Sequence, residues 1–234
     1  MIGPDSPVLD RLATVAAELG DLAERVVFIG GAIAPLLQTD PPFPRARVTS
    51  DVDGVVASHG CAEFDDVAAR LRARGFREDV SAAHVHRWMS PSGVPFDLVP
   101  AGAHLGGSGN PWDAAALDTA ERATLPGGTA IRHASAPAFL AQKLAAHHDR
   151  GRESPLDSHD LEDVLALLAS RPSVLGEIAA APPAVRAYLA DQARRFRDDP
   201  YAEDLLAAHL NNAQDPVATI AAVRLTLEEM SALG

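Results

Sequence analysis

Residues Val26–Val56 read VVFIGGAIAPLLQTDPPFPRARVTSDVDGVV, and this stretch decides how the rest of the chain is interpreted. The run Val26–Ile29 is apolar and predicts a short buried strand. It ends at Gly30 and Gly31, where a tight strand-to-helix turn is expected. The following apolar segment, Ala32–Leu37, fits a helix.

Two carboxylates lie at the far end of the same stretch. Thr39–Arg47 contains three prolines and is expected to be a loop or an extended segment. The valines at 52, 55 and 56 then predict a second strand, which would carry Asp51 and Asp53. Side chains at positions i and i+2 of a strand point to the same face of the sheet. Two like charges held side by side are unfavourable without a positive group between them, so the pair suggests a divalent metal site.

A third carboxylate follows in a predicted hairpin. Val85–Met89 and Val94–Val99 are expected to be strands, joined by a turn at Ser90–Gly93. Asp97 lies within the second strand among apolar residues, and a carboxylate in that setting requires a partner. Two partners are open at this stage: a metal shared with the other carboxylates, or a salt bridge to Arg87 across the hairpin.

The metal interpretation brings the three carboxylates and the two glycines into one site. Asp51, Asp53 and Asp97 would offer oxygen ligands from two neighbouring strands, which suits Mg²⁺. Gly30 and Gly31 would let backbone amides approach a phosphate group at the beginning of a helix. A metal bound next to a phosphate cradle is what phosphoryl or nucleotidyl transfer requires.

The remainder of the chain changes character near Ser135. Residues 1–134 mix strands and helices, whereas residues 135–234 are predicted to be helical. We therefore expect an α+β fold with an N-terminal core over 1–134 and a C-terminal helical domain over 135–234. Helical periodicity is clearest over these segments: 7–19, 63–74, 112–123, 160–168, 185–196, 202–210 and 217–230.

The overall composition of the chain argues against several classes of function. The chain has 234 residues, 47% of them hydrophobic, and no apolar run approaches the length of a membrane span. The N-terminus lacks the basic-then-apolar order of a signal peptide, so a cytoplasmic location without membrane partners is expected. The single cysteine, Cys61, excludes an intramolecular disulfide and a cysteine-based zinc site. A net charge of −12 argues against broad, non-specific binding of nucleic acid.

Several motifs, in this order along the chain, resemble the DNA polymerase β-like nucleotidyltransferase superfamily. The resemblance is greatest to the branch of the AbiEii abortive-infection toxins and related tRNA-modifying toxins. It covers roughly residues 26–168. The motifs are Gly30-Gly31, Arg47-x-Thr49-x-Asp51-x-Asp53, Phe96-Asp97-Leu98, and Lys143 followed by Arg150, Asp160-Leu161 and Asp163-Val164. The sequence departs from this pattern at Gly54, where a bulkier apolar residue is common, and in the Pro-rich and Gly-rich loops over 39–47 and 101–110.

The resemblance implies a polymerase β-like core, in which a mixed sheet is flanked by helices, followed by a helical bundle. It implies a Mg²⁺-dependent enzyme that transfers an NMP from an NTP such as ATP to an acceptor hydroxyl. Lys143 would contact the triphosphate with support from Asp160, and Arg47 and Thr49 would help bind the nucleotide. The acceptor could be a tRNA 3′ end, a protein hydroxyl or a small molecule, and an antitoxin partner is a further expectation.

Two other functions remain open. The chain could be a catalytically silent member of the fold that acts as a regulatory module or as one half of a toxin–antitoxin pair. It could also be an antibiotic nucleotidyltransferase of the aminoglycoside type. The histidines, which include His59, His84, His86, His147 and His148, are too scattered to favour a transition-metal site.

Overall fold

The computed structural model describes residues 6–43, 49–58, 60–82, 86–101, 109–151 and 154–234. The chain divides into two compact units. Ile2–Leu36 and Arg47–Ser135 form the first, which we call the sheet unit. Leu37–Ala46 and Ala136–Gly234, together with Met1, form the second, which we call the helical unit.

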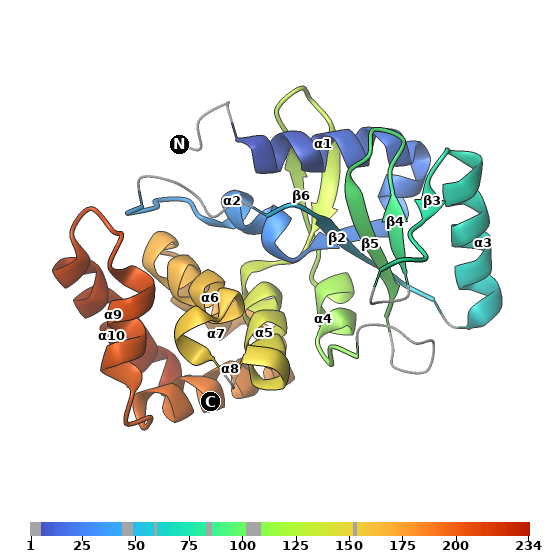
Figure 1. Cartoon of the computed structure of the whole chain (residues 1–234). Coiled ribbons are helices and arrows are strands. Elements are labelled where there is room, and N and C mark those ends of the chain that lie inside the picture. Colours follow the sequence, from blue (N-terminus) through green and yellow to red (C-terminus); the bar gives the residue numbers. More distant parts are fainter. Residues whose placement is uncertain (1–5, 44–48, 59, 83–85, 102–108, 152–153) are drawn as a thin grey trace. The chain divides into compact units, whose positions relative to one another are not determined.

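Among the described residues, the strands of the sheet unit form one mixed, seven-stranded sheet in the order β3-β4-β5-β2-β1-β7-β6. Strand β2 pairs antiparallel with β1 and parallel with β5, and Figure 1 shows β2, β5 and β4 side by side. The strands are β1 (Val26–Ile29), β2 (Val52–Val56), β3 (Arg77–Glu78), β4 (Arg87–Met89), β5 (Pro95–Pro100), β6 (Glu121–Thr124) and β7 (Ala130–His133).

The predicted hairpin is confirmed as β4 and β5, which pair antiparallel. In its turn the Ser90 amide donates to the Val94 carbonyl at 3.0 Å, and Gly93 adopts a φ of 79°, a region that favours glycine. Residues of β5 alternate between buried and half-buried positions, as a strand with two different faces requires.

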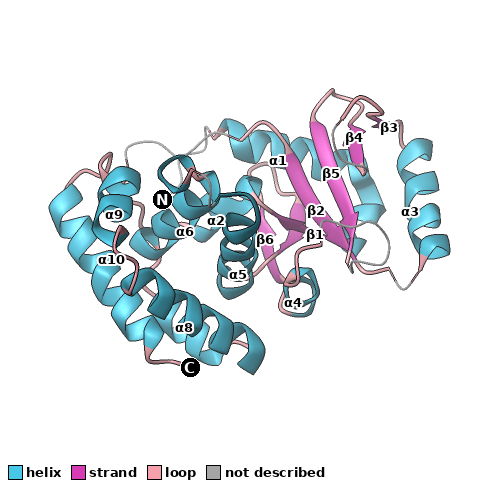
Figure 2. Cartoon of the chain, turned by 60° about the horizontal axis from the view of Figure 1, so that its bottom comes forward, coloured by secondary structure: helices cyan, strands magenta, loops and turns pink. Residues whose placement is uncertain are grey.

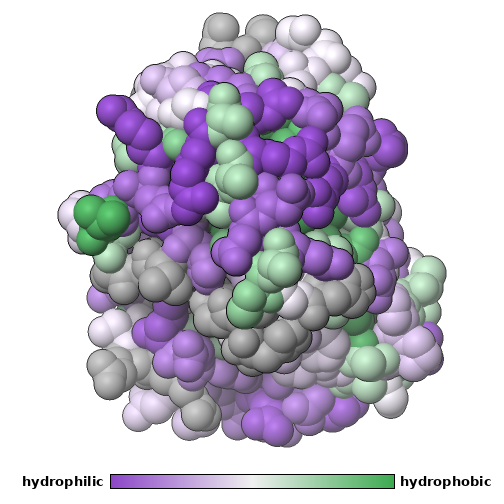
Figure 3. Space-filling model, turned by 90° about the vertical axis from the view of Figure 1, so that its right-hand side faces the viewer, coloured by the Kyte–Doolittle hydropathy of each residue, from purple (hydrophilic) through white to green (hydrophobic). Residues whose placement is uncertain are grey.

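Helices cover this sheet. Helix α1 (Pro7–Leu19) has the predicted bounds and buries Leu12, Val15 and Leu19 completely. Helix α3 (Cys61–Ala73) lies beyond the β3 edge in Figures 1 and 2. Figure 3 faces this side of the molecule and shows mostly hydrophilic side chains, with the hydrophobic ones in small separate groups. The remaining helices are α2 (Ala34–Leu37), α4 (Asp113–Asp118) and the 3₁₀ segments Gly20–Arg25 and Gly31–Ile33.

The prediction of a helix over 112–123 is wrong for the second half of that segment. Helix α4 ends at Asp118, and Glu121–Thr124 form the edge strand β6, which pairs antiparallel with β7. Residues of β6 are exposed or half-buried, so the strand carries no apolar alternation that could have revealed it. Pairing with the rest of the sheet overrides the local preference of this alanine-rich segment.

The described residues from Ala136 onward contain no strand, as Figure 2 shows by colour, and the predicted helical character is confirmed. A π-helical turn over His147–Gly151 and a 3₁₀ turn over Pro155–Asp157 separate the first two helices. The helices are α5 (Ala136–Ala146), α6 (His159–Ser170), α7 (Val174–Ala180), α8 (Pro183–Arg197), α9 (Ala202–Leu210) and α10 (Pro216–Ser231).

The segment Leu37–Pro42 belongs to the helical unit although it precedes the sheet unit's second strand in the chain. Its backbone is bound at three points. Arg171 Nη1 donates to the Leu37 carbonyl at 2.8 Å, the Asp40 amide donates to the Ser170 carbonyl at 2.7 Å, and the Gln214 amide donates to the Pro42 carbonyl at 2.9 Å. The first part of the Pro-rich segment is therefore a strap across the helical unit.

Among the described residues, no helix combines the length and the apolar character that crossing a membrane would require.

Gly54, at the centre of β2, lies where the sheet has no room for a side chain. It pairs with Phe28 on one side and Leu98 on the other, in the buried middle of the sheet. A Cβ at this position would lie 2.7 Å from Val26 Cγ1 and 3.2 Å from Phe96 Cε2. The bulk of these neighbours fills the space that a side chain on residue 54 would need.

We therefore expect Gly54→Ala to destabilise the protein by about 1–3 kcal/mol, the usual cost of overpacking a core. Urea unfolding followed by circular dichroism measures the difference. Gly176→Ala is the matched control, because Gly176 lies inside α7 and a Cβ there meets no atom within 4 Å, so this variant should lose no stability. Equal stability of the two variants would contradict the packing argument.

Candidate metal and nucleotide site

Strand register brings two of the predicted carboxylates together. Asp53 of β2 pairs with Asp97 of the parallel strand β5, and on its other side it pairs with Ile29 of β1. Directly paired residues project from the same face of a sheet, so the two carboxylates lie next to each other. The prediction that their strands are neighbours is confirmed.

Asp51 completes the group from the residue before β2. One carboxylate oxygen each from Asp51, Asp53 and Asp97 lies within 4.8 Å of the other two, and all three residues are half-buried. Carboxylate oxygens at this separation suit a hard divalent cation such as Mg²⁺, because one ion could contact all three. The donor set therefore fits the metal that the sequence predicts.

Residue 30 must be a glycine because the Asp53 carboxylate lies against it. It has a φ of 70°, and a Cβ on this residue would lie 2.1 Å from Asp53 Oδ2. The residue that follows, Gly31, begins a 3₁₀ segment, and α2 has only four residues. A helix this short adds little dipole, so the predicted phosphate cradle would depend on the backbone amides themselves. Phosphate binding by the two glycines stays a prediction.

Arg87 lies among the carboxylates. Its Nε donates to Asp97 Oδ1 at 2.7 Å, and its Nη2 donates to Asp97 Oδ2 at 2.6 Å and to Asp51 Oδ2 at 2.9 Å. The hydrogen bonds to Asp97 raise the pKa of the Arg87 guanidinium. Partial burial opposes this shift, and the charges of Asp97 and Asp51 reinforce it, so the guanidinium stays charged. The salt bridge that the sequence offered as the alternative partner of Asp97 is present, and it also reaches Asp51.

Thr49 fixes the orientation of Asp51. Its hydroxyl donates to Asp51 Oδ1 at 2.9 Å, and its own carbonyl accepts a hydrogen bond from Arg11 Nη1 at 2.5 Å. The predicted nucleotide contact of Thr49 stays a prediction, and the structure adds this positioning contact. Arg47 lies outside the described residues.

Lys143 and Asp160 form a second charged cluster, in the helical unit. Lys143 Nζ lies 2.7 Å from Asp163 and 3.1 Å from Asp160, and all three residues are buried. Asp160 also accepts from Arg150 Nε at 2.9 Å. The ammonium of Lys143 is thus paired with carboxylates inside the unit. The predicted role of Lys143 and Asp160 in nucleotide binding stays a prediction.

The charges in this cluster stabilise one another. Burial opposes the charged form of Lys143, but the ion pairs with Asp163 and Asp160 outweigh it and raise the pKa of the lysine. Burial likewise acts against the charged form of Asp160, and the hydrogen bonds and charges of Arg150 and Lys143 outweigh it and lower the pKa of the carboxyl.

The histidines do not assemble a metal site in the part of the chain that the structure describes, where the aspartate triad is the one cluster able to hold an ion. The His86 ring packs edge-on against Phe64, and His147 is hydrogen-bonded to Ser158 at 2.7 Å. His59 and His84 lie outside the described residues.

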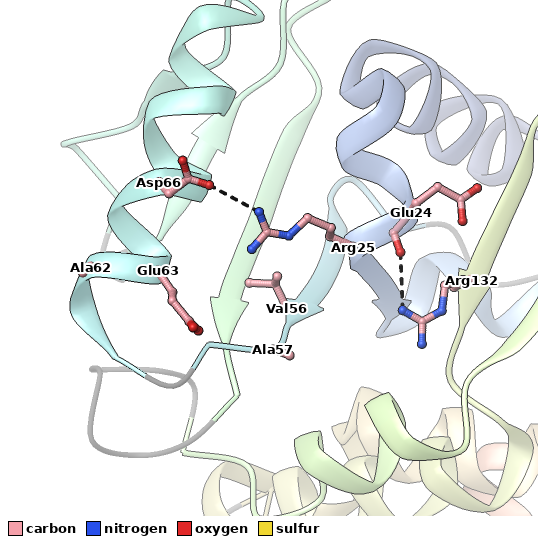
Figure 4. Close-up of a pocket in the computed structure, with 8 residues that line it drawn as sticks. All are labelled: Glu24, Arg25, Val56, Ala57, Ala62, Glu63, Asp66 and Arg132. Carbon is pink, nitrogen blue, oxygen red and sulfur yellow. Dashed lines mark hydrogen bonds and ion pairs between the residues drawn. The ribbon is translucent and has the colours of Figure 1, made fainter.

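A hollow of about 670 Å³ lies at the other end of β2, away from the carboxylates, and is lined by Val56 and Ala57. Two arginines enter it, and both have partners (Figure 4): Arg25 pairs with Asp66 at 3.3 Å, and Arg132 donates to the Glu24 carbonyl at 3.4 Å. Arg25 and Asp66 neutralise each other and Arg132 is bound to a backbone carbonyl, so the charged groups of the hollow do not converge on one point. Asp51, Asp53 and Asp97, which we call the acid cluster, remain the candidate site.

Neither a protein-family model nor a curated protein sequence matches the chain. Solved structures do show a likeness. An antigenic nucleotidyltransferase-like protein from Paracoccidioides brasiliensis is 19% identical, with a TM-score of 0.48 and 92% of each chain covered. JHP933 from Helicobacter pylori is 13% identical, with a TM-score of 0.49, over 97% of this chain and 93% of the other.

The contact between Gly30 and Asp53 leads to a first site prediction. Gly30→Ala should destabilise the protein by about 2–4 kcal/mol, because it adds a clash with a carboxylate to the cost of a left-handed alanine. Gly93→Ala is the control, since that residue also has a positive φ but its Cβ would meet no atom within 4 Å. Denaturant unfolding should show the larger loss of unfolding free energy for Gly30→Ala. Equal losses would mean that the Asp53 side chain moves aside without cost.

The buried cluster leads to a pH-dependent prediction. Because the pKa of Asp160 is lowered on folding, its ion pairs stabilise the protein above the unfolded pKa of about 4, and this contribution is lost as the pH falls through the folded pKa. Asp160→Asn should therefore cost about 3 kcal/mol at pH 7, and the difference from the wild type should shrink in acid. Far-ultraviolet circular dichroism during urea unfolding at pH 7 and pH 3 measures both values.

Asp157→Asn serves as the control for that experiment. Asp157 is exposed and lies three residues from Asp160, so its effect should be within about 0.5 kcal/mol at either pH. A loss for Asp160→Asn that is equally large in acid would show that the cost comes from packing rather than from charge.

Proposed function

We propose that this protein is a Mg²⁺-dependent nucleotidyltransferase, which transfers an NMP from an NTP to an acceptor hydroxyl. The observation that carries the proposal is the convergence of Asp51, Asp53 and Asp97, from two adjacent strands, to within 4.8 Å. Three carboxylates held this close repel one another, so a bound cation would stabilise the group. Gly30 has no side chain, and the Asp53 carboxylate fills the space that a Cβ there would occupy.

Each residue then has a separate task. Asp51 and Asp53 would hold the metal that carries the nucleotide, and Thr49 keeps Asp51 oriented through its hydroxyl. When bound, the metal would neutralise phosphate charge and lower the pKa of a coordinated hydroxyl. Asp97 would complete the ligand set and accept the acceptor's proton, which requires that one of its oxygens be released from Arg87.

The proposed acceptor is a tRNA 3′ end, because the motifs resemble the AbiEii-type toxins. A protein hydroxyl and a small molecule such as an aminoglycoside are the other acceptors to test. Transfer assays with α-labelled and γ-labelled NTPs against total RNA, lysate protein and an aminoglycoside panel would distinguish these. Label from the α-phosphate alone should enter the product, since nucleotidyl transfer releases the two outer phosphates.

A second function is favoured by one specific observation. Arg87 already balances part of the charge of Asp97 and Asp51, as it would in a silent member of the fold that uses the site only for structure. Such a protein would act by binding, for example as half of a toxin–antitoxin pair. Its biological effect would survive the loss of the metal ligands.

Substitution of Asp53 distinguishes the two functions. Asp53→Asn should reduce nucleotidyl transfer at least about 100-fold, because it removes a charged ligand with almost no change in shape. Calorimetry should show that the wild type binds an NTP analogue with Mg²⁺ and that the variant binds it much more weakly.

Asp65→Asn is the matched control for charge, since Asp65 is exposed on α3 of the same unit. The proposal fails if the wild type binds no NTP in the presence of Mg²⁺. It also fails if the biological effect of the protein is undiminished in Asp53→Asn.

A further inference from the structure

Arg87 occupies the position at which a cation would balance the acid cluster. Its guanidinium makes two hydrogen bonds to Asp97 and one to Asp51, all between 2.6 and 2.9 Å. The side chains of Arg87 and Asp97 are 23% and 17% exposed, so water screens this contact only in part. Three carboxylate oxygens of the cluster, both of Asp97 and Oδ2 of Asp51, are therefore engaged by N–H donors.

The backbone directs Arg87 to this position. It is paired in register with Asp97, at the first residue of β4. The residue before it, His86, has a φ of 81°, which is uncommon for any residue other than glycine. The His86 carbonyl accepts from the Leu98 amide at 3.1 Å, so this turn residue is held against β5 immediately before β4 begins. Strain of this kind persists only where the surrounding structure imposes it.

A metal and Arg87 compete for the same oxygens. Coordination of a cation by Asp51 and Asp97 would break hydrogen bonds to the guanidinium and place two positive charges close together. A bare divalent ion provides no acceptor for the N–H groups of Arg87 that would lose their carboxylate partners. A nucleoside triphosphate provides such acceptors, because its phosphate oxygens match the planar fork of a guanidinium.

We propose that Arg87 is a built-in competitor of the metal, which keeps the acid cluster closed to a free divalent cation and yields when the cation arrives with a nucleoside triphosphate. The inference rests on the proposed function and adds an order of binding to it. Arg87 thereby acts as a positioning and specificity residue: before binding it holds Asp51 and Asp97, and afterwards it contacts the phosphates.

Binding of Mn²⁺ followed by electron paramagnetic resonance tests this without any turnover. Free MnCl₂ should bind Arg87→Gln at least about tenfold more tightly than the wild type, because the competing charge and its N–H donors are gone. With an α,β-methylene ATP analogue present, the wild type should bind Mn²⁺ strongly, and the advantage of the variant should disappear. Arg122→Gln is the matched control, since Arg122 is exposed on β6, four strands from β5, and should leave Mn²⁺ binding unchanged.

Arg87→Lys provides a second variant in case Arg87→Gln does not fold. A lysine keeps the charge but cannot bridge both carboxylates with a planar fork, so free Mn²⁺ should bind about threefold or more tightly than to the wild type. Thermal melts establish that each variant is folded.

Two failures are distinguishable. If the wild type and both Arg87 variants bind free Mn²⁺ equally, Arg87 is only a structural clamp and this inference is overturned, while the proposed function stands. If neither the wild type nor any variant binds Mn²⁺, with or without the nucleotide, the acid cluster is not a metal site, and the inference and the proposed function fall together.

Discussion

Electrostatic balance at the junction of β2 and β5 is the constraint on which the rest of the site depends. The parallel register places Asp53 against Asp97, and Asp51 lies within reach of both. Three carboxylates so close together repel one another strongly in a half-buried setting. The hairpin that contains Asp97 also carries Arg87, directly across from it, and so provides the balancing cation from the neighbouring strand. The acid cluster and its counter-ion are consequences of a single pattern of strand pairing.

Much of the sheet unit could be predicted from its sequence because the decisive signals are local. Gly30 and Gly31 end an apolar strand, and Ser90–Gly93 turn a hairpin, so β1, β4 and β5 follow from patterns a few residues long. The edge strand β6 could not be predicted in this way, since its residues are mostly exposed and its only support is the pairing with β7. Its partner β7 follows after residues 125–129 only, so the pairing is local, but an exposed strand has no apolar periodicity to indicate it.

The candidate site was predictable as a set of residues but not as a set of contacts. Asp51, Asp53 and Asp97 stand out because carboxylates are costly in or beside apolar strands. The sequence left two partners open for Asp97, a metal or Arg87. The structure places the arginine among the carboxylates, while they still fit a metal. The three-membered bridge from Asp97 through Arg87 to Asp51 depends on strand register at the atomic level, which no spacing rule conveys. Thr49 is a similar case, because its bond to Asp51 depends on the local bend before β2.

The strap Leu37–Pro42 has a consequence for how the molecule can be divided. The chain leaves the sheet unit after Leu36, is hydrogen-bonded to α6 and to the segment before α10, and then returns to form β2. A fragment that begins at Ser135 would contain every helix from α5 to α10 and would still lack this strap. Arg171 would keep its ion pair with Glu177, but its Nη1 and the Ser170 carbonyl would lose their bonds to the strap. The helical unit is therefore discontinuous along the chain, and a linker that replaces residues 47–135 and joins the strap to α5 would be needed to produce it intact on its own.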